Sequence, residues 1–221
     1  VPTPSNKDGS INLNILEECI ASINKVINKS EPIILIRSTV IPGTTKDLSE
    51  KFKDLNLVFN PEFLREKSAN EDFVSQSRYI IGGEPKNTSK VAELYKKRFG
   101  KEIVVIETDF QTAELIKYMC NNFFAAKVSF MNEMKLICDS VGADWNDALK
   151  GFISDERVGN SHNDVPGHDG KLGFGGSCFP KDIQAMLHFA GTKNLDLPVV
   201  QGAWETNLNV RPEKDWEKLK G

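Results

Sequence analysis

A stretch of thirty residues without proline or glycine, residues 112–141, constrains the fold of this chain more than any other feature. Apolar side chains recur along it at helical spacing, which predicts one continuous helix. Such a helix is roughly 45 Å long, enough to pass from one domain into another. The apolar stripe consists of Ile116, Met119, Phe123, Ala126, Phe130, Met134, Ile137 and Val141.

Phe124 and Leu136 lie off this stripe, so the predicted helix is apolar on more than one side. A helix with apolar residues around much of its circumference is typical of burial on several sides. We therefore expect residues 112–141 to pack against a second subunit as well as against their own domain.

The first 110 residues alternate between short apolar runs and amphipathic helical runs. Continuous apolar strands that alternate with helices predict an α/β fold with a parallel sheet covered on both faces. Strands are expected at 33–36, 57–59, 79–81 and 103–106, and helices at 13–27, 44–52 and 88–99.

The remainder of the chain contains helical patterns and no strand pattern. A loop rich in glycine, aspartate and asparagine occupies residues 154–177, and two closing helices are expected at 183–195 and 199–208. Loops of this length inside compact domains are often lids or binding loops. The chain is thus expected to contain a sheet domain (1–110), a helical domain (111–210) and a charged linker (211–221).

Composition narrows the possible functions. The charged residues nearly balance, at a formal net charge of −3, and no basic block suggests a nucleic-acid interface. The apolar runs are too short to span a bilayer and no signal pattern begins the chain, so the cytoplasm is expected. Four cysteines without paired close spacing and three scattered histidines predict neither a disulfide framework nor a metal site.

Cys178 lies in the segment G-F-G-G-S-C-F-P-K-D, residues 173–182. A thiol reacts as its thiolate, which backbone N–H groups or a nearby cation favour. The glycines allow the backbone to approach a ligand, Pro180 restrains the chain after the thiol, and Lys181 supplies positive charge. We predict that Cys178 is a nucleophile. The alternative, a buried structural cysteine, is expected instead for Cys19, Cys120 and Cys138.

Lys117 and Asn121 are four residues apart on the predicted long helix and therefore share one face. A solvated lysine is the usual case. An ammonium and an amide directed together into a cleft would instead stabilise a developing oxyanion.

Polar residues also follow two of the predicted strands. Residues 37–45 place hydroxyl groups at a strand's carboxyl end, where α/β sheets bind ligands, although Thr44 or Thr45 would serve equally as helix N-caps. Glu62 and Glu66 either share a site or are helix N-terminal charges. A thiol, a lysine–amide pair, two carboxylates and a hydroxyl are together what thioester formation and hydrolysis require.

Four motifs occur in order: V-P-T-P…D-G-S, R-S-T-V-I-P-G-T-T, N-P-E-F-L-R-E and G-F-G-G-S-C-F-P-K-D. Over nearly its entire length the chain resembles the UDP-glucose/GDP-mannose dehydrogenase family of NAD-dependent enzymes. The resemblance implies a partial Rossmann-like sheet followed by an all-α central domain, joined by the long helix. It also implies oxidation of a nucleotide sugar's C6 alcohol to the uronic acid with two NAD, in a homodimer that packs through residues 112–141.

The resemblance further implies roles for individual residues. Cys178 would trap the aldehyde as a thiohemiacetal, whose oxidation gives a thioester. Lys117 and Asn121 would hold the oxyanion. The remaining catalytic positions are Asp182 and Thr39, which would order a water, and Glu62, a general base.

Other positions are implied to bind ligands. Thr3, Thr39 and Glu66 match positions near the NAD cofactor. Arg157 matches an arginine that the family donates across its dimer interface to the substrate. The sugar nucleotide would be lined by Phe63, Leu64, Arg65, Lys117, Asn121, Phe174 and Gly175.

The chain departs from the family pattern in three places. The G-x-G-x-x-G turn is absent, as is the C-terminal domain, so the sequence is expected to be an interior piece with impaired activity of its own. Residues 166–171 make a longer loop than is common in the family. The motifs fit glucose, mannose and N-acetylated hexosamine derivatives equally.

Two other functions remain open. One is a dimerisation and binding module of the same family without catalysis. The other is a cysteine hydrolase or acyltransferase, which needs a base beside the thiol. His188 is ten residues beyond Cys178 on a predicted helix, which disfavours that second alternative.

Overall fold

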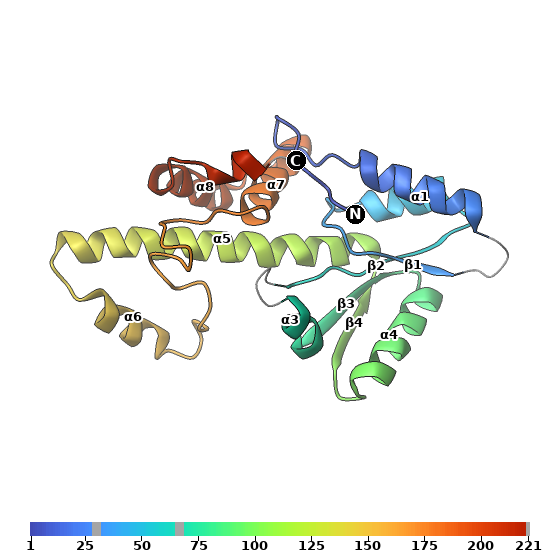
Figure 1. Ribbon diagram of the computed structural model, residues 1–221, viewed down its shortest axis with the longest axis horizontal. Helices are drawn as coiled ribbons and strands as arrows, with labels where there is room; N and C mark the ends of the chain where they lie inside the picture. The colour runs from blue at the N-terminus through green and yellow to red at the C-terminus, as the bar shows by residue number, and fades with distance from the viewer. Residues whose placement is uncertain (28–31, 65–68, 220–221) are drawn as a thin grey trace. The chain divides into compact units, whose positions relative to one another are not determined.

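A computed structural model describes residues 1–27, 32–64 and 69–219 (Figure 1). The chain forms two compact units. The first comprises Val1–Asn6 and Ile11–Tyr118, and the second comprises Lys7–Ser10 and Met119–Gly221. The long helix α5 (Phe110–Ser140) confirms the predicted 112–141 helix, and the division between the units falls within it.

The first unit is built on a four-stranded sheet in the order β1-β2-β3-β4. The strand pairs β1–β2 and β3–β4 are parallel, whereas β2 and β3 are antiparallel. The strands are β1 (Ile33–Ile36), β2 (Asn56–Phe59), β3 (Arg78–Gly83) and β4 (Val104–Thr108).

The α/β class is therefore confirmed, and the sheet is rich in parallel pairs rather than parallel throughout. The helices α2 (Thr44–Lys51) and α4 (Pro85–Phe99) connect the two parallel pairs and contribute buried residues. Between β2 and β3 lies α3 (Ala69–Ser75), which buries none of its residues. Its Phe73 nevertheless packs against the core cluster that contains Val58 and Tyr79, and β3 pairs with β2 in the antiparallel direction.

Alternation along the strands creates a separate core on each face of the sheet. Leu57, Phe59 and Ile80 pack on one face with α1 (Asn14–Val26), α2 and the start of α5. Val58 and Tyr79 pack on the other face with α4. Successive strand residues point to opposite faces, so the sheet is covered on both sides as the sequence predicts.

The second unit contains the rest of α5 with three further helices and a short 3₁₀ helix. Asp144 caps its first new helix by accepting the N–H of Asp147 at 2.9 Å. The buried residues of its core are Ala125, Phe174, Ile183 and Ala203. The elements are α6 (Trp145–Ile153), α7 (Phe179–Thr192), α8 (Pro198–Val210) and η2 (Asp215–Leu219).

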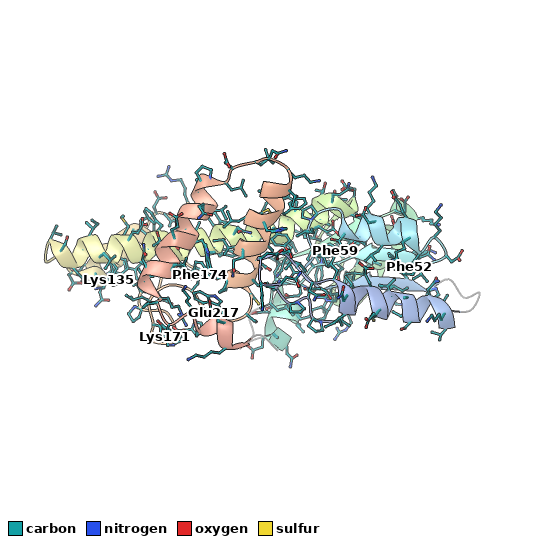
Figure 2. All side chains as sticks on the ribbon, turned by 90° about the horizontal axis from the view of Figure 1, so that it is seen from above. Phe52, Phe59, Lys135, Lys171, Phe174 and Glu217 are labelled. Atoms are coloured by element: carbon teal, nitrogen blue, oxygen red, sulfur yellow. The ribbon has the colours of Figure 1, made fainter. Side chains whose placement is uncertain are left out.

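Helix α7 begins four residues before its predicted start at 183, with Pro180 in its first turn. Proline suits that position because the first helical N–H groups have no partner within the helix. Residues 211–219 pack within the second unit, where Trp216 is buried and its ring centroid lies 5.3 Å from that of Trp204. Their role as a linker stays a prediction. Figure 2 shows Phe59 and Phe174, each among the side chains of its own unit.

Candidate active site

Cys178 occupies the N-cap position of α7, and its side chain is exposed. Its carbonyl accepts the N–H of Asp182 at 2.9 Å, and its Sγ lies 3.7 Å from Ser177 Oγ. A helix N-terminus presents backbone N–H groups and favours negative charge. The other three cysteines are buried or half-buried, so Cys178 has the one exposed thiol among the residues described.

Asp182 lies one turn into α7 and only 1% of its surface is exposed. Its Oδ2 accepts a hydrogen bond from Asn121 Nδ2 at 2.5 Å, and its Oδ1 accepts one from Lys181 Nζ at 2.5 Å. Both carboxylate oxygens are thus bound, as a buried charge requires. Lys181 was expected to supply charge to the thiol, and the structure instead pairs it with Asp182.

The first unit holds a second polar group, centred on the buried Lys117. Lys117 Nζ donates to the carbonyl of Glu62 at 2.5 Å and lies 3.3 Å from Glu62 Oε1. It also lies 5.3 Å from the ring centroid of Phe63. Glu62 Oε2 accepts the N–H of Leu64 at 2.7 Å, in the irregular segment that follows β2.

Thr3, near the start of the chain, lies beside Thr39, which follows β1. Thr3 Oγ1 donates to the carbonyl of Thr39 at 2.8 Å, and Ser38 Oγ donates to the carbonyl of Val1 at 2.6 Å. The loops after β1 and β2 leave the carboxyl ends of two neighbouring parallel strands. Hydroxyl groups therefore gather at the sheet edge where α/β folds bind ligands.

Glu114 is a buried residue whose structural role the sequence did not reveal. It is 0% exposed, and its carboxylate accepts the N–H of Gly43 at 2.6 Å and that of Thr45 at 2.7 Å. It therefore caps α2 from α5, where Thr44 or Thr45 had been considered as caps. Burial raises the pKa of Glu114 to about 7. No local pattern signals a cap supplied from 69 residues away.

The remaining predicted residues are dispersed. Phe174 is buried in the core of the second unit, and Gly175 follows it. Arg157, in the loop after α6, is almost fully exposed and pairs with Asp155 through Nη2 at 2.5 Å and Nε at 2.9 Å. Arg65 and Glu66 lie outside the described residues.

Two models of a single family match consecutive segments of the chain. The NAD binding domain of the UDP-glucose/GDP-mannose dehydrogenase family matches residues 1–99, and the central domain of the same family matches residues 111–209. The chain belongs to this family.

Curated proteins that resemble this chain in sequence belong to the same family. A UDP-glucose 6-dehydrogenase of Rickettsia bellii is 38% identical over 99% of this chain and 50% of its own length. One from Rickettsia felis is 35% identical over 99% of the chain and 48% of its own length. The chain therefore spans about half the length of the curated relatives it matches.

Solved structures share the fold. A UDP-glucose dehydrogenase from Pyrobaculum islandicum superposes with a TM-score of 0.81 at 32% identity, over 94% of this chain and 48% of that one. A UDP-D-ManNAc dehydrogenase from Pyrococcus horikoshii gives 0.78 at 25% identity, over 95% and 49%. These likenesses support the Rossmann-like assignment of the first unit.

NAD is the cofactor indicated by the family match to residues 1–99. The residues present fit such a ligand, because Thr3, Ser38 and Thr39 gather at the carboxyl edge of β1 and β2. Within 1–27, 32–64 and 69–219, no three His, Cys, Asp or Glu side chains cluster as metal ligands would. Nor does any helix in those ranges have the length and apolarity to cross a membrane.

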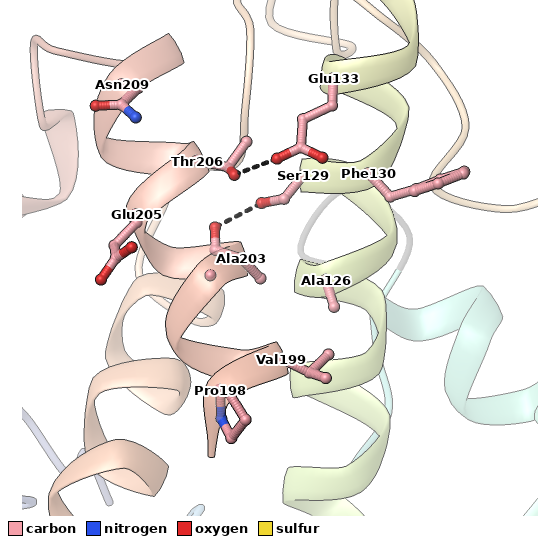
Figure 3. A pocket seen from close by; sticks show the side chains of 11 residues that line it. Ala126, Ser129, Phe130, Glu133, Pro198, Val199, Ala203, Glu205, Thr206 and Asn209 are labelled. Atoms are coloured by element: carbon pink, nitrogen blue, oxygen red, sulfur yellow. Dashed lines mark hydrogen bonds between the residues drawn. The ribbon is translucent and has the colours of Figure 1, made fainter. Parts of the chain in front are cut away.

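A groove of about 480 Å³ lies between α5 and α8 in the second unit (Figure 3). Ser129 Oγ donates to the carbonyl of Ala203 at 2.7 Å, and Thr206 Oγ1 donates to Glu133 Oε1 at 2.6 Å. These bonds fasten α8 to α5. None of the residues predicted for catalysis or ligand binding lines this groove.

Proposed function

We propose that this chain carries part of the active site of an NAD-dependent nucleotide-sugar 6-dehydrogenase. The substrate would be a UDP-glucose-like nucleotide sugar, and the product would be the corresponding uronic acid. The observation that carries the proposal is the exposed Cys178 at the start of α7, one turn from a buried Asp182 bound to Asn121. Relatives named UDP-glucose 6-dehydrogenase support the substrate class.

In this proposal Cys178 acts at the aldehyde level of the substrate. Its thiolate adds to the C6 carbonyl carbon, forming a C–S bond and a thiohemiacetal. Removal of two electrons converts the thiohemiacetal into a thioester. Water then attacks the thioester carbon, the C–S bond breaks, and the thiolate leaves with a carboxylate at C6. NAD, when bound, supplies the two-electron acceptor for each oxidation, so two molecules are consumed per substrate.

Lys117 and Asn121 would stabilise the oxygen that becomes negatively charged during these steps. The contacts of both side chains support this role, because each is buried and donates to a residue that bears a carboxylate, Glu62 or Asp182. Glu62 would remove a proton from the attacking water, and Asp182 with Thr39 would orient that water.

Ligand binding would involve several residues of this chain and a second subunit. Thr3, Thr39 and Glu66 would contact NAD, and the sugar nucleotide would be lined by residues 63–65, Phe174 and Gly175. Arg157 would reach the substrate of a partner in a homodimer formed through α5. The exposure of the Arg157 side chain and of several α5 apolar side chains supports this arrangement.

The stoichiometry of NAD reduction tests the proposal in the full-length protein. With limiting UDP-glucose we expect two NADH per sugar nucleotide and none from the Cys178→Ala variant. GDP-mannose and UDP-N-acetylmannosamine, assayed in parallel, identify the sugar. Absence of NADH formation with all three, or a yield of one NADH per sugar, contradicts the proposal.

A second candidate function is a dimerisation and binding module without catalysis. The exposed apolar stripe of α5 favours it, since such a stripe serves assembly whether or not the thiol reacts. Sedimentation combined with sugar-nucleotide titration separates the two functions. A dimer that binds the ligand but forms no NADH supports the module, and a monomer that binds nothing excludes it.

A further inference from the structure

The loop of residues 172–177 leads into Cys178 and is held by side chains from α5 and α8. Asn132 Oδ1 accepts the N–H of Gly173 at 3.0 Å. Asn207 binds Phe174 twice, because its Oδ1 accepts the N–H at 2.7 Å and its Nδ2 donates to the carbonyl at 3.0 Å. One amide side chain thus satisfies both backbone polar groups of Phe174, as a neighbouring strand would.

The glycines of this loop make room for α8 and for the residue that follows it. A methyl group at Gly173 would overlap Asn207 Oδ1, and one at Gly175 would overlap the guanidinium of Arg211. A methyl group at Gly176 would meet nothing within 4 Å. Two of the glycines therefore admit protein side chains, whereas the sequence suggested that they admit a ligand.

Arg211 also contacts this loop, and only 2% of its surface is exposed. It pairs with Asp169 at 2.5 Å and Asp215 at 2.9 Å, and it donates to the carbonyl of Leu172 at 3.3 Å. The longer 166–171 loop is thereby anchored through Asp169. A buried guanidinium with two carboxylates and a carbonyl has well-satisfied donors and a defined position.

Phe174 connects these contacts to the start of α7, where Cys178 lies. The Phe174 ring meets the Phe179 ring edge-on, with the centroids 6.1 Å apart. Phe179 is the first residue of α7, directly after Cys178. Ile183, one turn further along α7, belongs to the same core cluster as Phe174. A shift of Phe174 would therefore be transmitted to the end of α7 that carries the thiol.

We propose that Asn207, supported by Arg211, is a positioning residue for Cys178. It fixes Phe174 by two hydrogen bonds, and Phe174 fixes the start of α7. Asn207 is 0% exposed and acts through the loop instead of contacting a ligand. The proposal rests on the proposed function only in treating Cys178 as the reacting group, and the placement of the thiol is measurable without turnover.

The test compares Asn207→Asp with Asn209→Asp in the full-length protein. Both changes place a carboxylate on α8, but residue 209 is exposed whereas residue 207 binds Phe174. Aspartate at 207 can still accept the N–H of Phe174 but, when ionised, cannot donate to its carbonyl. The rate of Cys178 alkylation by iodoacetamide is followed by peptide mass spectrometry, which separates Cys178 from the other cysteines, and kcat and KM are measured in parallel.

We expect Asn207→Asp to change the alkylation rate about fivefold or more and to lower kcat about tenfold, with the KM for NAD changed less than about threefold. Asn209→Asp should match the wild type in each measurement. An Asn207→Asp protein with wild-type alkylation and kcat overturns the proposal. If the wild type forms no NADH with any sugar nucleotide, the proposed function fails and the alkylation rates alone decide the positioning role.

A second pair of variants decides the question if Asn207→Asp does not fold. Gly175→Ala introduces a methyl group that meets Arg211 and should change the alkylation rate about threefold or more. In an Arg211→Ala background the same change should have a smaller effect, because the clash with the guanidinium is gone and Asp215, the other side chain near the new methyl group, is released from its ion pair. Equal effects in the two backgrounds overturn the proposal, since the loop would then be insensitive to Arg211.

Discussion

The two faces of α5 in the second unit have opposite characters. The buried face carries polar side chains, among them Asn121, Ser129 and Asn132, which bond to α7, α8 and the loop before Cys178. The exposed face is apolar, with Met119, Phe123, Phe130, Met134 and Ile137 open to solvent. An ordinary surface helix has the reverse arrangement.

Helix α4 of the first unit shows that ordinary arrangement. It buries Val91, Ala92 and Tyr95, and its last turn carries Lys96, Lys97 and Arg98. Apart from the isolated Leu94, its apolar residues pack within its own unit, whereas those on the exposed face of α5 do not. We therefore propose that α5 contributes its buried face to a polar site and its exposed face to a partner.

The largest effect is expected on the buried face of α5, at Asn121. Replacing Asn121 with alanine removes the donor to Asp182 and the proposed oxyanion partner, so kcat should fall about 10²–10³-fold. Steady-state NADH formation measures this change. The exposed-face variant Met119→Ala, two residues away, is the matched control and should retain kcat at protein concentrations where the dimer persists. An Asn121→Ala protein with wild-type kcat would contradict a catalytic role for this face.

The next effect concerns Glu114, on the part of α5 that belongs to the first unit. Burial raises its folded-state pKa from 4.5 to about 7, so the folded protein binds the proton more tightly than the unfolded chain does. Its contribution to stability is fully present below the unfolded pKa and is lost as pH rises through about 7. The free energy of unfolding should fall over pH 4.5–7 by at most about 3 kcal/mol on this account.

Urea denaturation at a series of pH values, with wild type and Glu114→Gln in parallel, measures that contribution. The glutamine variant cannot titrate at this position, so its stability should vary less over the same pH range. Equal pH dependence in the two proteins would show that Glu114 does not have the raised pKa.

A smaller effect is expected on the exposed face, at Phe123, whose surface is 63% exposed. Phe123→Asp should weaken self-association about 10²-fold or less, because aromatic residues dominate apolar interfaces. Leu94→Asp on α4, at a site 59% exposed, is the matched control, since isolated exposed apolar residues are normal. Sedimentation equilibrium that shows the same association constant for Phe123→Asp and wild type would refute a partner on this face.

Much of this arrangement could be predicted from the sequence, because it depends on local patterns. The absence of proline and glycine over 112–141 predicted α5, and the apolar runs predicted the four strands. The spacing of Lys117 and Asn121 predicted that they share a face of one helix. The residues around Cys178 predicted an unusual cysteine, and the structure gives it an exposed thiol.

The contacts that the sequence did not predict join residues far apart along the chain. Glu114 caps α2, Asn207 holds Phe174, and Arg211 packs against Gly175, each across more than thirty residues. Their residue types are common on helices, and only tertiary packing gives them these partners. The antiparallel direction of the β2–β3 pair is likewise not signalled by the apolar runs of the two strands.

The most direct test of the account is a search for the covalent intermediate on Cys178. Glu62→Gln should slow hydrolysis of the thioester, because it removes the proposed general base. Full-length Glu62→Gln protein, mixed with UDP-glucose and NAD and quenched in acid, should carry the sugar nucleotide as a thioester on the Cys178 peptide. The Cys178→Ala protein should carry no adduct and form no NADH. An unmodified Cys178 in the Glu62→Gln protein, together with NADH formation by Cys178→Ala, would contradict the account.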